Sequence, residues 1–269
     1  MTRRNRILLL TALLMTAPAS CSVLEDRADC PCFLDVDFTG VKAECGGLRL
    51  TAGTTLFLDD VSRYSAGGAV DAVGDTVCLA VEKGAYQVLT AVFTSGRMFW
   101  DGTAVRNGEG MCFDSLYAAS DYAGCTGETA YVRPVPKKQF ITVRVTDTES
   151  GLFLRQHSLT VKGDVNGLEL SDLSPTAGPS EAAFSPEGDG DTLSVRVPRF
   201  DGDGFTIEIL RKENGGPHHS IQLGEAMRSV GYDFTAGSLD DVLLTLDFRR
   251  MTGTIRVSGW DKEKIIAII

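Results

Sequence analysis

The chain has 269 residues and a formal net charge of -10 at pH 7; 43% of its residues are hydrophobic and 23% are charged. This length predicts one or two domains, and the composition excludes a chain that is disordered throughout. Binding to nucleic acid is not expected, because it needs a net basic surface or stripe.

The first twenty residues predict a secretory signal peptide. Three arginines, at positions 3, 4 and 6, precede a nine-residue apolar run at 7–15, and small residues follow at 17–20. The apolar run is too short to span a bilayer, and this order of regions is typical of export signals. Removing residues 1–20 would leave a mature chain with a formal charge of -13, because the segment carries three arginines and no acidic residue.

The predicted signal peptide ends directly before a cysteine. A small residue, Ser20, precedes Cys21, as in a bacterial lipobox, so we expect cleavage between them and acylation of Cys21. Acyl chains such as palmitate would hold the protein to a membrane without a spanning segment. Residues 21–32 would then form the lipidated N-terminal segment. Cleavage one or two residues away, which would leave Cys21 free, is the alternative.

The other cysteines are an even number, which is consistent with disulfides in an exported chain. They are Cys30, Cys32, Cys45, Cys78, Cys112 and Cys125. The sequence does not fix their connectivity, although Cys112 and Cys125 bracket a loop-like stretch and are one plausible pair. A zinc site is not expected, because one CxC element and three histidines do not supply the paired ligands that zinc requires.

Short strands separated by turns are predicted from residue 33 onward. The first half contains β-rich runs at 33–38, 54–58, 76–81 and 86–94, separated by Gly, Asp and Ser clusters. Regularly spaced short strands of this kind indicate a sandwich or barrel. Two prolines within 133–138 predict a stiff connector, so we expect one β-sandwich over 33–133 and another over 134–269.

The second half repeats the β pattern without a fixed period. Residues 140–146 alternate in polarity, and the Pro-, Gly- and Ser-rich stretch 171–191 predicts a long loop. Further expectations are a hairpin of 192–197 and 205–210 across an Asp-Gly-Asp-Gly turn at 201–204, a short helix at 224–230, and a final strand pair at 241–248 and 253–260. The expected fold class is therefore all-β, with two domains in tandem.

Residues that could carry chemistry are not grouped in the sequence. The acidic run 201–204 resembles part of a calcium loop but is shorter than the twelve residues that such a loop needs. Nucleophile-elbow, zinc-protease, P-loop and dinucleotide-binding motifs do not occur in this sequence. We therefore expect neither enzymatic activity nor a cofactor or metal.

The C-terminal tail is a short, β-branched and nearly uncharged run. Its apolar residues are Ile265, Ile266, Ala267, Ile268 and Ile269. Such a run readily adds to an unpaired sheet edge. It is a candidate donor strand for a neighbouring subunit, and the alternative is the last strand of its own sheet.

Both ends of the mature chain resemble the FimB-type fimbrial anchor lipoproteins of Bacteroidetes. At the N-terminus the resemblance rests on Cys-Ser-Val-Leu-Glu-Asp-Arg at 21–27 and Cys-Pro-Cys-Phe-Leu-Asp-Val-Asp at 30–37. At the C-terminus it rests on Gly-Tyr-Asp at 231–233, Leu-Asp-Asp-Val at 239–242, Leu-Asp-Phe at 246–248 and Ile-Arg-Val at 255–257, closing on Trp260.

This resemblance implies two transthyretin-like β-sandwich domains after a lipoprotein signal peptide. It also implies a minor fimbrial subunit, exposed at the cell surface and held in the outer membrane by its lipid. Such a subunit anchors a fimbria assembled by donor strands, contacts the stalk subunits and can limit fibre length. Glu25 and Asp26 match the acidic surface-export signal that follows the lipidated cysteine in these proteins.

Two other functions are compatible with the same sequence. One is a surface lipoprotein that binds glycans through exposed aromatic residues, for which Phe99, Trp100 and Trp260 are candidates. The other is an accessory adhesin subunit at the fimbrial tip, because anchor and tip proteins share sandwich folds.

Overall fold

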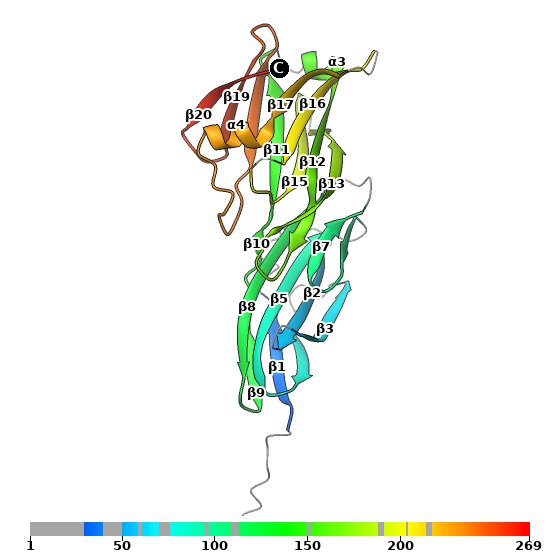
Figure 1. The fold of residues 1–269 in the computed structure, drawn as a ribbon, viewed down its shortest axis with the longest axis vertical. Helices are drawn as coiled ribbons and strands as arrows, with labels where there is room; N and C mark the ends of the chain where they lie inside the picture. Colours follow the sequence, from blue (N-terminus) through cyan, green and yellow to red (C-terminus); the bar gives the residue numbers. More distant parts are fainter. Residues whose placement is uncertain are drawn as a thin grey trace, which may run out of the picture.

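The protein is an elongated all-β molecule, seen here in a computed structural model (Figure 1). The structure describes residues 30–39, 50–58, 61–69, 76–94, 97–108, 113–149, 152–187, 191–202, 204–213 and 217–269. Strand β1 lies at one end of the long axis, whereas the C-terminus lies at the other. The first described strand and the last residue are therefore far apart.

In the described part of the chain, two short helices accompany the strands, and the elements follow in chain order. They are β1 (Cys32–Asp37), β2 (Leu50–Leu58), β3 (Val61–Ala69), β4 (Thr76–Val81), β5 (Gly84–Thr94), β6 (Met98–Trp100), β7 (Ala104–Asn107), β8 (Leu116–Cys125), β9 (Thr129–Val132), β10 (Lys137–Lys138), β11 (Phe140–Asp147), α3 (Leu152–Gln156), β12 (His157–Glu169), β13 (Pro175–Ala183), β14 (Ser185–Glu187), β15 (Thr192–Pro198), β16 (Phe205–Arg211), β17 (Pro217–Gln222), α4 (Leu223–Ser229), β18 (Val242–Asp247), β19 (Thr252–Val257) and β20 (Glu263–Ala267).

The N-terminal half contains two sheets around one core. The first has the order β4-β1-β9 and the second the order β10-β8-β5-β2-β3. Alternate residues of β1 point inward, so that Cys32, Leu34 and Val36 are fully buried while Phe33 is exposed. They pack with Leu56 and Tyr86 of the second sheet, as the alternation of side chains in a half-buried strand requires.

The C-terminal half is built from two six-stranded sheets. Their orders are β14-β15-β11-β18-β19-β20 and β17-β16-β12-β7-β6, with β13 added beside β12. The alternation predicted over 140–146 is present, because Ile141, Val143 and Val145 are fully buried in the core between the sheets. Strands β11 and β18 run parallel and the other pairs of the first sheet are antiparallel.

A third core joins the two halves. The hairpin of β6 and β7 comes from the N-terminal half but pairs with β12, where Val105 lies opposite Leu168. Phe93 and Leu116 are buried in the same cluster as Phe140 and Leu168. Apolar packing and backbone hydrogen bonds thus cross the predicted boundary at 133/134, and the division into two transthyretin-like sandwiches stays a prediction.

The predicted hairpin of 192–197 and 205–210 is wrong. Strand β15 pairs with β11 and β14, whereas β16 pairs with β12 and β17 of the other sheet. The connection therefore passes from one sheet to the other, and Phe200 and Phe205 at its two ends are buried and pack edge to face, with ring centroids 4.9 Å apart. Burial of these aromatic rings outweighs the turn preference of the Asp-Gly-Asp-Gly sequence.

The predicted loop at 171–191 is also wrong over most of its length. Strand β13 pairs with β12, with irregular register at two points, and β14 pairs with β15. Both are edge strands, in which proline is tolerated because a backbone N–H on the solvent side is not needed for strand pairing. The prolines in these strands are Pro175, Pro179 and Pro186. The predicted short helix is confirmed as α4, and the predicted last pair as β18 and β19.

Candidate functional site: the C-terminal edge of the molecule

The apolar tail forms a strand of its own sheet in this structure. Strand β20 is antiparallel to β19, with Ile265 opposite Thr254 and Ile266 opposite Gly253. It is the last strand in the sheet order, so in the described part of the chain β19 is its only strand neighbour. The outer side of β20 is therefore a sheet edge, the feature to which another strand can add.

The five apolar residues of the tail differ sharply in burial. Ile265 and Ile269 are 72% and 78% exposed, and Ala267 is also exposed. Ile266 is half-buried, and Ile268 is 6% exposed within the core of the C-terminal half. One side chain of the tail is thus buried in the core, whereas most of the others present apolar surface to solvent.

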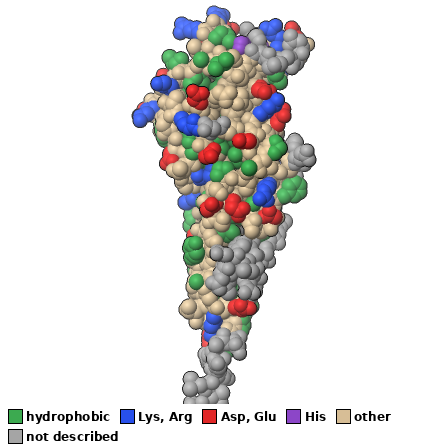
Figure 2. Space-filling view, viewed as in Figure 1, with side chains coloured by type: hydrophobic (Ala, Val, Ile, Leu, Met, Phe, Trp, Pro, Cys, Tyr) green, Lys and Arg blue, Asp and Glu red, His purple; other side chains and the backbone are tan. Residues whose placement is uncertain are grey.

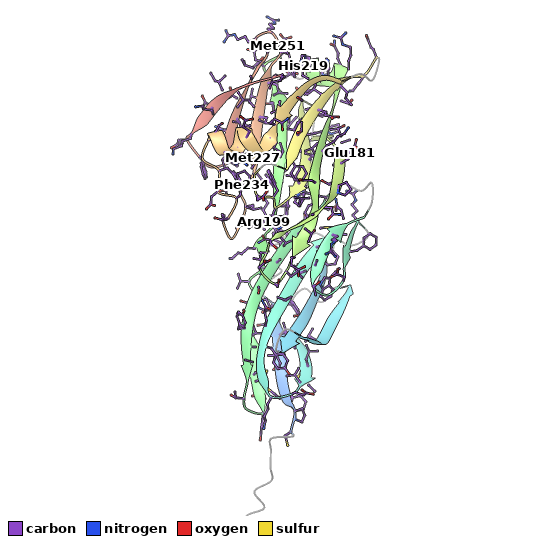
Figure 3. All side chains as sticks on the ribbon, viewed as in Figure 1. Glu181, Arg199, His219, Met227, Phe234 and Met251 are labelled. Carbon is purple, nitrogen blue, oxygen red and sulfur yellow. The ribbon has the colours of Figure 1, made fainter. Side chains whose placement is uncertain are left out.

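The backbone of the tail is hydrogen-bonded to both sheets of the C-terminal half. The Ile268 N–H donates to the Met251 carbonyl at 3.2 Å, in the turn between β18 and β19. Ile269 exchanges two backbone hydrogen bonds with Ser220 of β17, which belongs to the other sheet. Figure 3 labels Met251 and His219, the residue before Ser220, at the end of the molecule where these contacts occur.

A groove lies between β20 and α4. Its volume is about 210 Å³. Ile221, Gln222, Glu225, Ala226 and Ser229 line one side, and Lys264, Ile265, Ile266, Ala267 and Ile269 line the other. Helix α4 is held in place because Leu223 and Met227 are buried in the core (Figure 3). The groove combines a fixed helical wall with an exposed strand edge.

The C-terminal motifs that carry the family resemblance have structural roles in this fold. Tyr232 is buried, and its hydroxyl donates to the Asp240 carbonyl at 2.8 Å. Burial raises the pKa of Tyr232 well above its usual value. Leu239 is buried, and its N–H donates to the Lys138 carbonyl at 3.1 Å. These residues fix the loop before β18 to the junction between the two halves.

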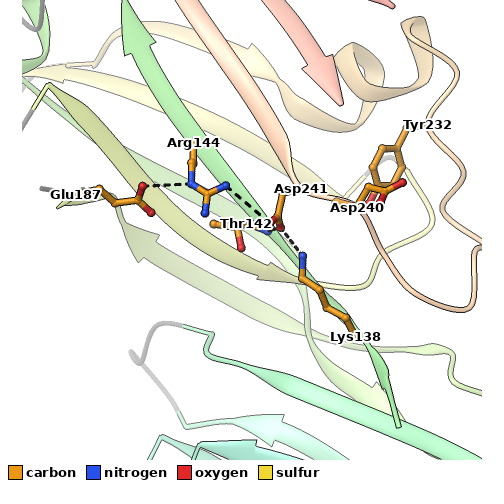
Figure 4. Close-up of polar contacts among 7 residues, drawn as sticks. All are labelled: Lys138, Thr142, Arg144, Glu187, Tyr232, Asp240 and Asp241. Atoms are coloured by element: carbon orange, nitrogen blue, oxygen red, sulfur yellow. Dashed lines mark hydrogen bonds and ion pairs between the residues drawn. The ribbon is translucent and has the colours of Figure 1, made fainter. Parts of the chain in front are cut away.

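Asp241 ties three strands together (Figure 4). Its carboxylate accepts the Thr142 N–H at 2.8 Å, contacts Lys138 of β10 and lies 3.8 Å from Arg144. Arg144 also donates to Glu187 of β14 at 3.1 Å. The network connects the start of β18 with β10 and β11 through side-chain contacts.

Arg199 is a buried cation that sequence reasoning missed. It is 7% exposed and donates to the Gln139 side chain at 2.8 Å, to the Phe234 carbonyl at 2.7 Å and to the Ala236 carbonyl (Figure 3). Burial lowers the pKa of its guanidinium. Three carbonyl oxygens satisfy the charge, so Arg199 holds the 231–241 loop against the core.

A second cluster lies at the N-terminal end of the molecule. Asp37, 4% exposed at the end of β1, accepts hydrogen bonds from the Thr39 N–H at 2.8 Å, from Arg133 Nε at 2.7 Å and from the Tyr131 hydroxyl. Hydrogen bonds from Thr39, Tyr131 and Arg133 hold the pKa of Asp37 well below its usual value. The cluster fastens β1 to β9 and the residue that follows it.

The predicted N-terminal site lies outside the described residues. This applies to Ser20 and Cys21 at the cleavage and lipidation site, to Glu25 and Asp26, and to Cys45 and Cys112. The four described cysteines are free thiols: Cys30 and Cys78 are exposed, and Cys32 and Cys125 are buried. The suggested Cys112–Cys125 pairing is not described, whereas Cys125 contacts Cys32.

The three candidate glycan-binding aromatic residues are not equally accessible. Phe99 of β6 is 63% exposed, whereas Trp100 is half-buried and packs against the third core, which joins the two halves. Trp260 is half-buried and packs against the core of the C-terminal half. The structure therefore leaves Phe99 as the exposed member of the set.

Two kinds of feature are absent from the described residues. Among them, no group of histidine, cysteine and acidic side chains is placed to hold a metal ion. Within the same part of the chain, no helix is both long and apolar enough to cross a bilayer. Acidic and basic side chains are interspersed over the face shown in Figure 2.

Comparisons with known proteins identify the fold but not a sequence family. No family model matches this sequence, and no curated protein matches it. Among solved structures, a candidate polysaccharide-binding protein of Bacteroides thetaiotaomicron superposes with a TM-score of 0.61 at 12% identity, covering 90% of this chain and 99% of that one. The similarity is thus structural and extends over nearly the whole chain.

Two further structures give the same result. A candidate adhesin of Bacteroides ovatus has a TM-score of 0.58 and 14% identity, covering 88% of this chain and 95% of that one. The fimbrial anchor protein Mfa2 of Porphyromonas gingivalis has a TM-score of 0.59 and 13% identity, covering 89% of this chain and all of the other. The all-β fold is therefore shared with these three proteins.

Proposed function

We propose that this protein is a minor fimbrial subunit that anchors a fimbria to the outer membrane. In this proposal the lipid on Cys21 attaches the chain to the membrane, and the protein is exposed at the cell surface. Glu25 and Asp26 serve as the surface-export signal. The fold is shared with a fimbrial anchor protein over 89% of the chain, which supports this class over an enzyme.

The observation that carries the proposal is the placement of the two ends. Strand β1, which follows the predicted lipidated segment, lies at one end of the long axis, and the edge strand β20 lies at the other (Figure 1). A tether between a membrane and a fibre needs its two attachment points separated in this way. The two halves are joined by a shared core and by β7–β12 pairing, which suits a rigid spacer.

We assign the contact with the first stalk subunit to the exposed edge of β20 and its groove. Ile265 and Ile269 offer apolar surface beside an unpaired strand edge, the combination used in β-strand addition. Residues 265–269 remain the candidate donor strand, although in this structure 265–267 pair with β19 and Ile269 is bonded to Ser220 of β17. Donation would require that pairing to open and Ile268 to leave the core.

The direct test is made in the native host. Deleting the gene is expected to release long fimbriae into the medium, because the fibre would lose its tether and its length control. A chromosomal Cys21→Ala variant should likewise release the protein from the membrane fraction, whereas Cys78→Ser, an exposed cysteine elsewhere, should not. Attached fibres of normal length on the deletion strain, or membrane retention of Cys21→Ala, would contradict the proposal.

A glycan-binding surface protein or a tip adhesin is the second candidate function. The exposed Phe99 favours it, as does the fold shared with a candidate polysaccharide-binding protein. Reproducible binding to a glycan array, lost in Phe99→Ala and kept in Phe33→Ala, would support this candidate. Immunogold labelling at the free end of fimbriae would favour a tip subunit over an anchor.

A further inference from the structure

Two buried thiols from distant parts of the sequence meet in the N-terminal core. Cys32 is the first residue of β1 and Cys125 the last residue of β8, and both are fully buried in the same apolar cluster. The two side chains are hydrogen-bonded to each other. Strands β1 and β8 are in contact, so the pair meets the first requirement of a disulfide, which is that its two cysteines lie side by side.

The remaining described cysteines are poorly placed to compete for either thiol. In the pairing of β1 with β4, Cys32 lies opposite Val81 and Cys78 opposite Asp35. Asp35 is three residues from Cys32, so it points to the opposite face of the strand, and Cys78 shares that exposed face. Cys78 is hydrogen-bonded to Asp35, and Cys30 is exposed before the start of β1.

We propose that Cys32 and Cys125 form a structural disulfide in the exported protein. The step joins the two sulfur atoms and removes one hydrogen from each thiol. The two protons and two electrons pass to the disulfide of an exported thiol–disulfide oxidoreductase, which leaves as a dithiol. An oxidising compartment outside the cytoplasm supplies that class of oxidant.

The surroundings of the pair indicate when the bond forms. The pKa of Cys125 is raised to about 12. Burial is the larger cause, and the hydrogen bond with Cys32 is the next. The thiolate is the attacking species in disulfide exchange, so the closed core makes Cys125 unreactive. A bond made before the core closes would afterwards be protected from exchange, because both cysteines are fully buried.

The position of the cross-link has a mechanical consequence, which rests on the proposed function. Tension from a lipidated N-terminus would enter the domain at Cys32. Without the cross-link, the hydrogen bonds of β1 to β4 and β9 would resist that tension. With it, tension passes directly to β8, which is paired with β5 along its length and with β10 at its other end.

Peptide mapping of the full-length exported protein tests the cross-link without reference to fimbriae. The protein is alkylated at lysis and digested without reduction by trypsin and chymotrypsin. Chymotryptic cleavage between Cys112 and Cys125 separates these residues, and a Cys30→Ser variant removes the ambiguity between Cys30 and Cys32. We expect a peptide containing Cys32 joined to one containing Cys125, in both wild type and Cys30→Ser.

Alkylated Cys32 and Cys125 in the unreduced protein would overturn the proposal, as would a bond from either residue to another cysteine. The linked peptide should be lost in Cys125→Ser and retained in the matched control Cys78→Ser. Because the mapping uses the wild-type chain, a misfolded variant does not leave the question open. A confirmed cross-link in a protein whose deletion leaves fimbriae attached would reject only the proposed function.

Discussion

The last residue of the chain, Ile269, is joined to Ser220 by a reciprocal pair of backbone hydrogen bonds. The Ser220 N–H donates to the Ile269 carbonyl at 2.7 Å, and the Ile269 N–H donates to the Ser220 carbonyl at 3.2 Å. Ser220 lies in β17 and Ile269 follows β20, the edge strands of two different sheets. The chain end thus closes one side of the C-terminal half and positions the groove beside α4.

Two isoleucines of the tail should separate folding from partner contact. Ile268→Ala removes a buried side chain and is expected to lower the free energy of unfolding by about 2 to 4 kcal/mol. Ile265→Ala removes a side chain that is 72% exposed, so its effect on stability should stay within about 0.5 kcal/mol. Urea unfolding of both variants measures these changes.

The exposed isoleucine of this pair, Ile265, also tests the assigned contact surface. If the β20 edge holds the stalk, Ile265→Ser should reduce co-purification of stalk subunits while the variant stays as stable as wild type. Phe33→Ser, also an exposed apolar residue but at the opposite end, is the matched control. Normal co-purification with Ile265→Ser would count against the assignment of this edge.

Arg199 should contribute strongly to stability. Arg199→Ala would leave the Gln139 side chain and the Phe234 and Ala236 carbonyls without their charged donor, and the expected loss is about 3 kcal/mol. Arg249→Ala, in which an exposed arginine is removed, should change the unfolding free energy by less than about 1 kcal/mol. Equal urea midpoints for the two variants would contradict the role given to Arg199.

Asp37 should make stability depend on pH in the acid range. Its pKa is lowered in the folded state, so its contribution is fully present above the unfolded value of about 3.9 and is lost as the pH falls toward the folded value. Asp37→Asn should therefore lower the melting temperature most above about pH 5 and progressively less below about pH 4. Asp261→Asn, an exposed carboxylate at the other end, is the control.

Gly167 should control the junction between the two halves. A Cβ atom at this position would lie against the Val105 carbonyl and 2.9 Å from the Arg106 Cα, both in β7. Gly167→Ala is expected to push β7 away from β12 and to cost roughly 1 to 3 kcal/mol. Gly124→Ala is the matched strand control, because nothing lies within 4 Å of its added Cβ. Limited proteolysis should cut the 98–107 hairpin faster in Gly167→Ala only.

The residue pattern of a single segment was enough to predict some of the strands and one helix. Alternation placed Ile141, Val143 and Val145 on a buried face and indicated the last strand pair, and the short helix expected at 224–230 is present as α4. The long strands β8 and β12 were not predicted. Their burial depends on neighbours that are distant in sequence, such as β5 beside β8 and β16 beside β12.

The candidate site shows the same division. The sequence alone predicted an export signal, which stays a prediction, and it determined the all-β class and an apolar C-terminal strand, because these depend on composition or on the two-residue period of one segment. Only the tertiary structure decided which strands pair, that β20 is an edge, and that Cys32 contacts Cys125. Pairing depends on burial shared between distant segments, and turn residues such as 201–204 cannot override it when Phe200 and Phe205 fill the core.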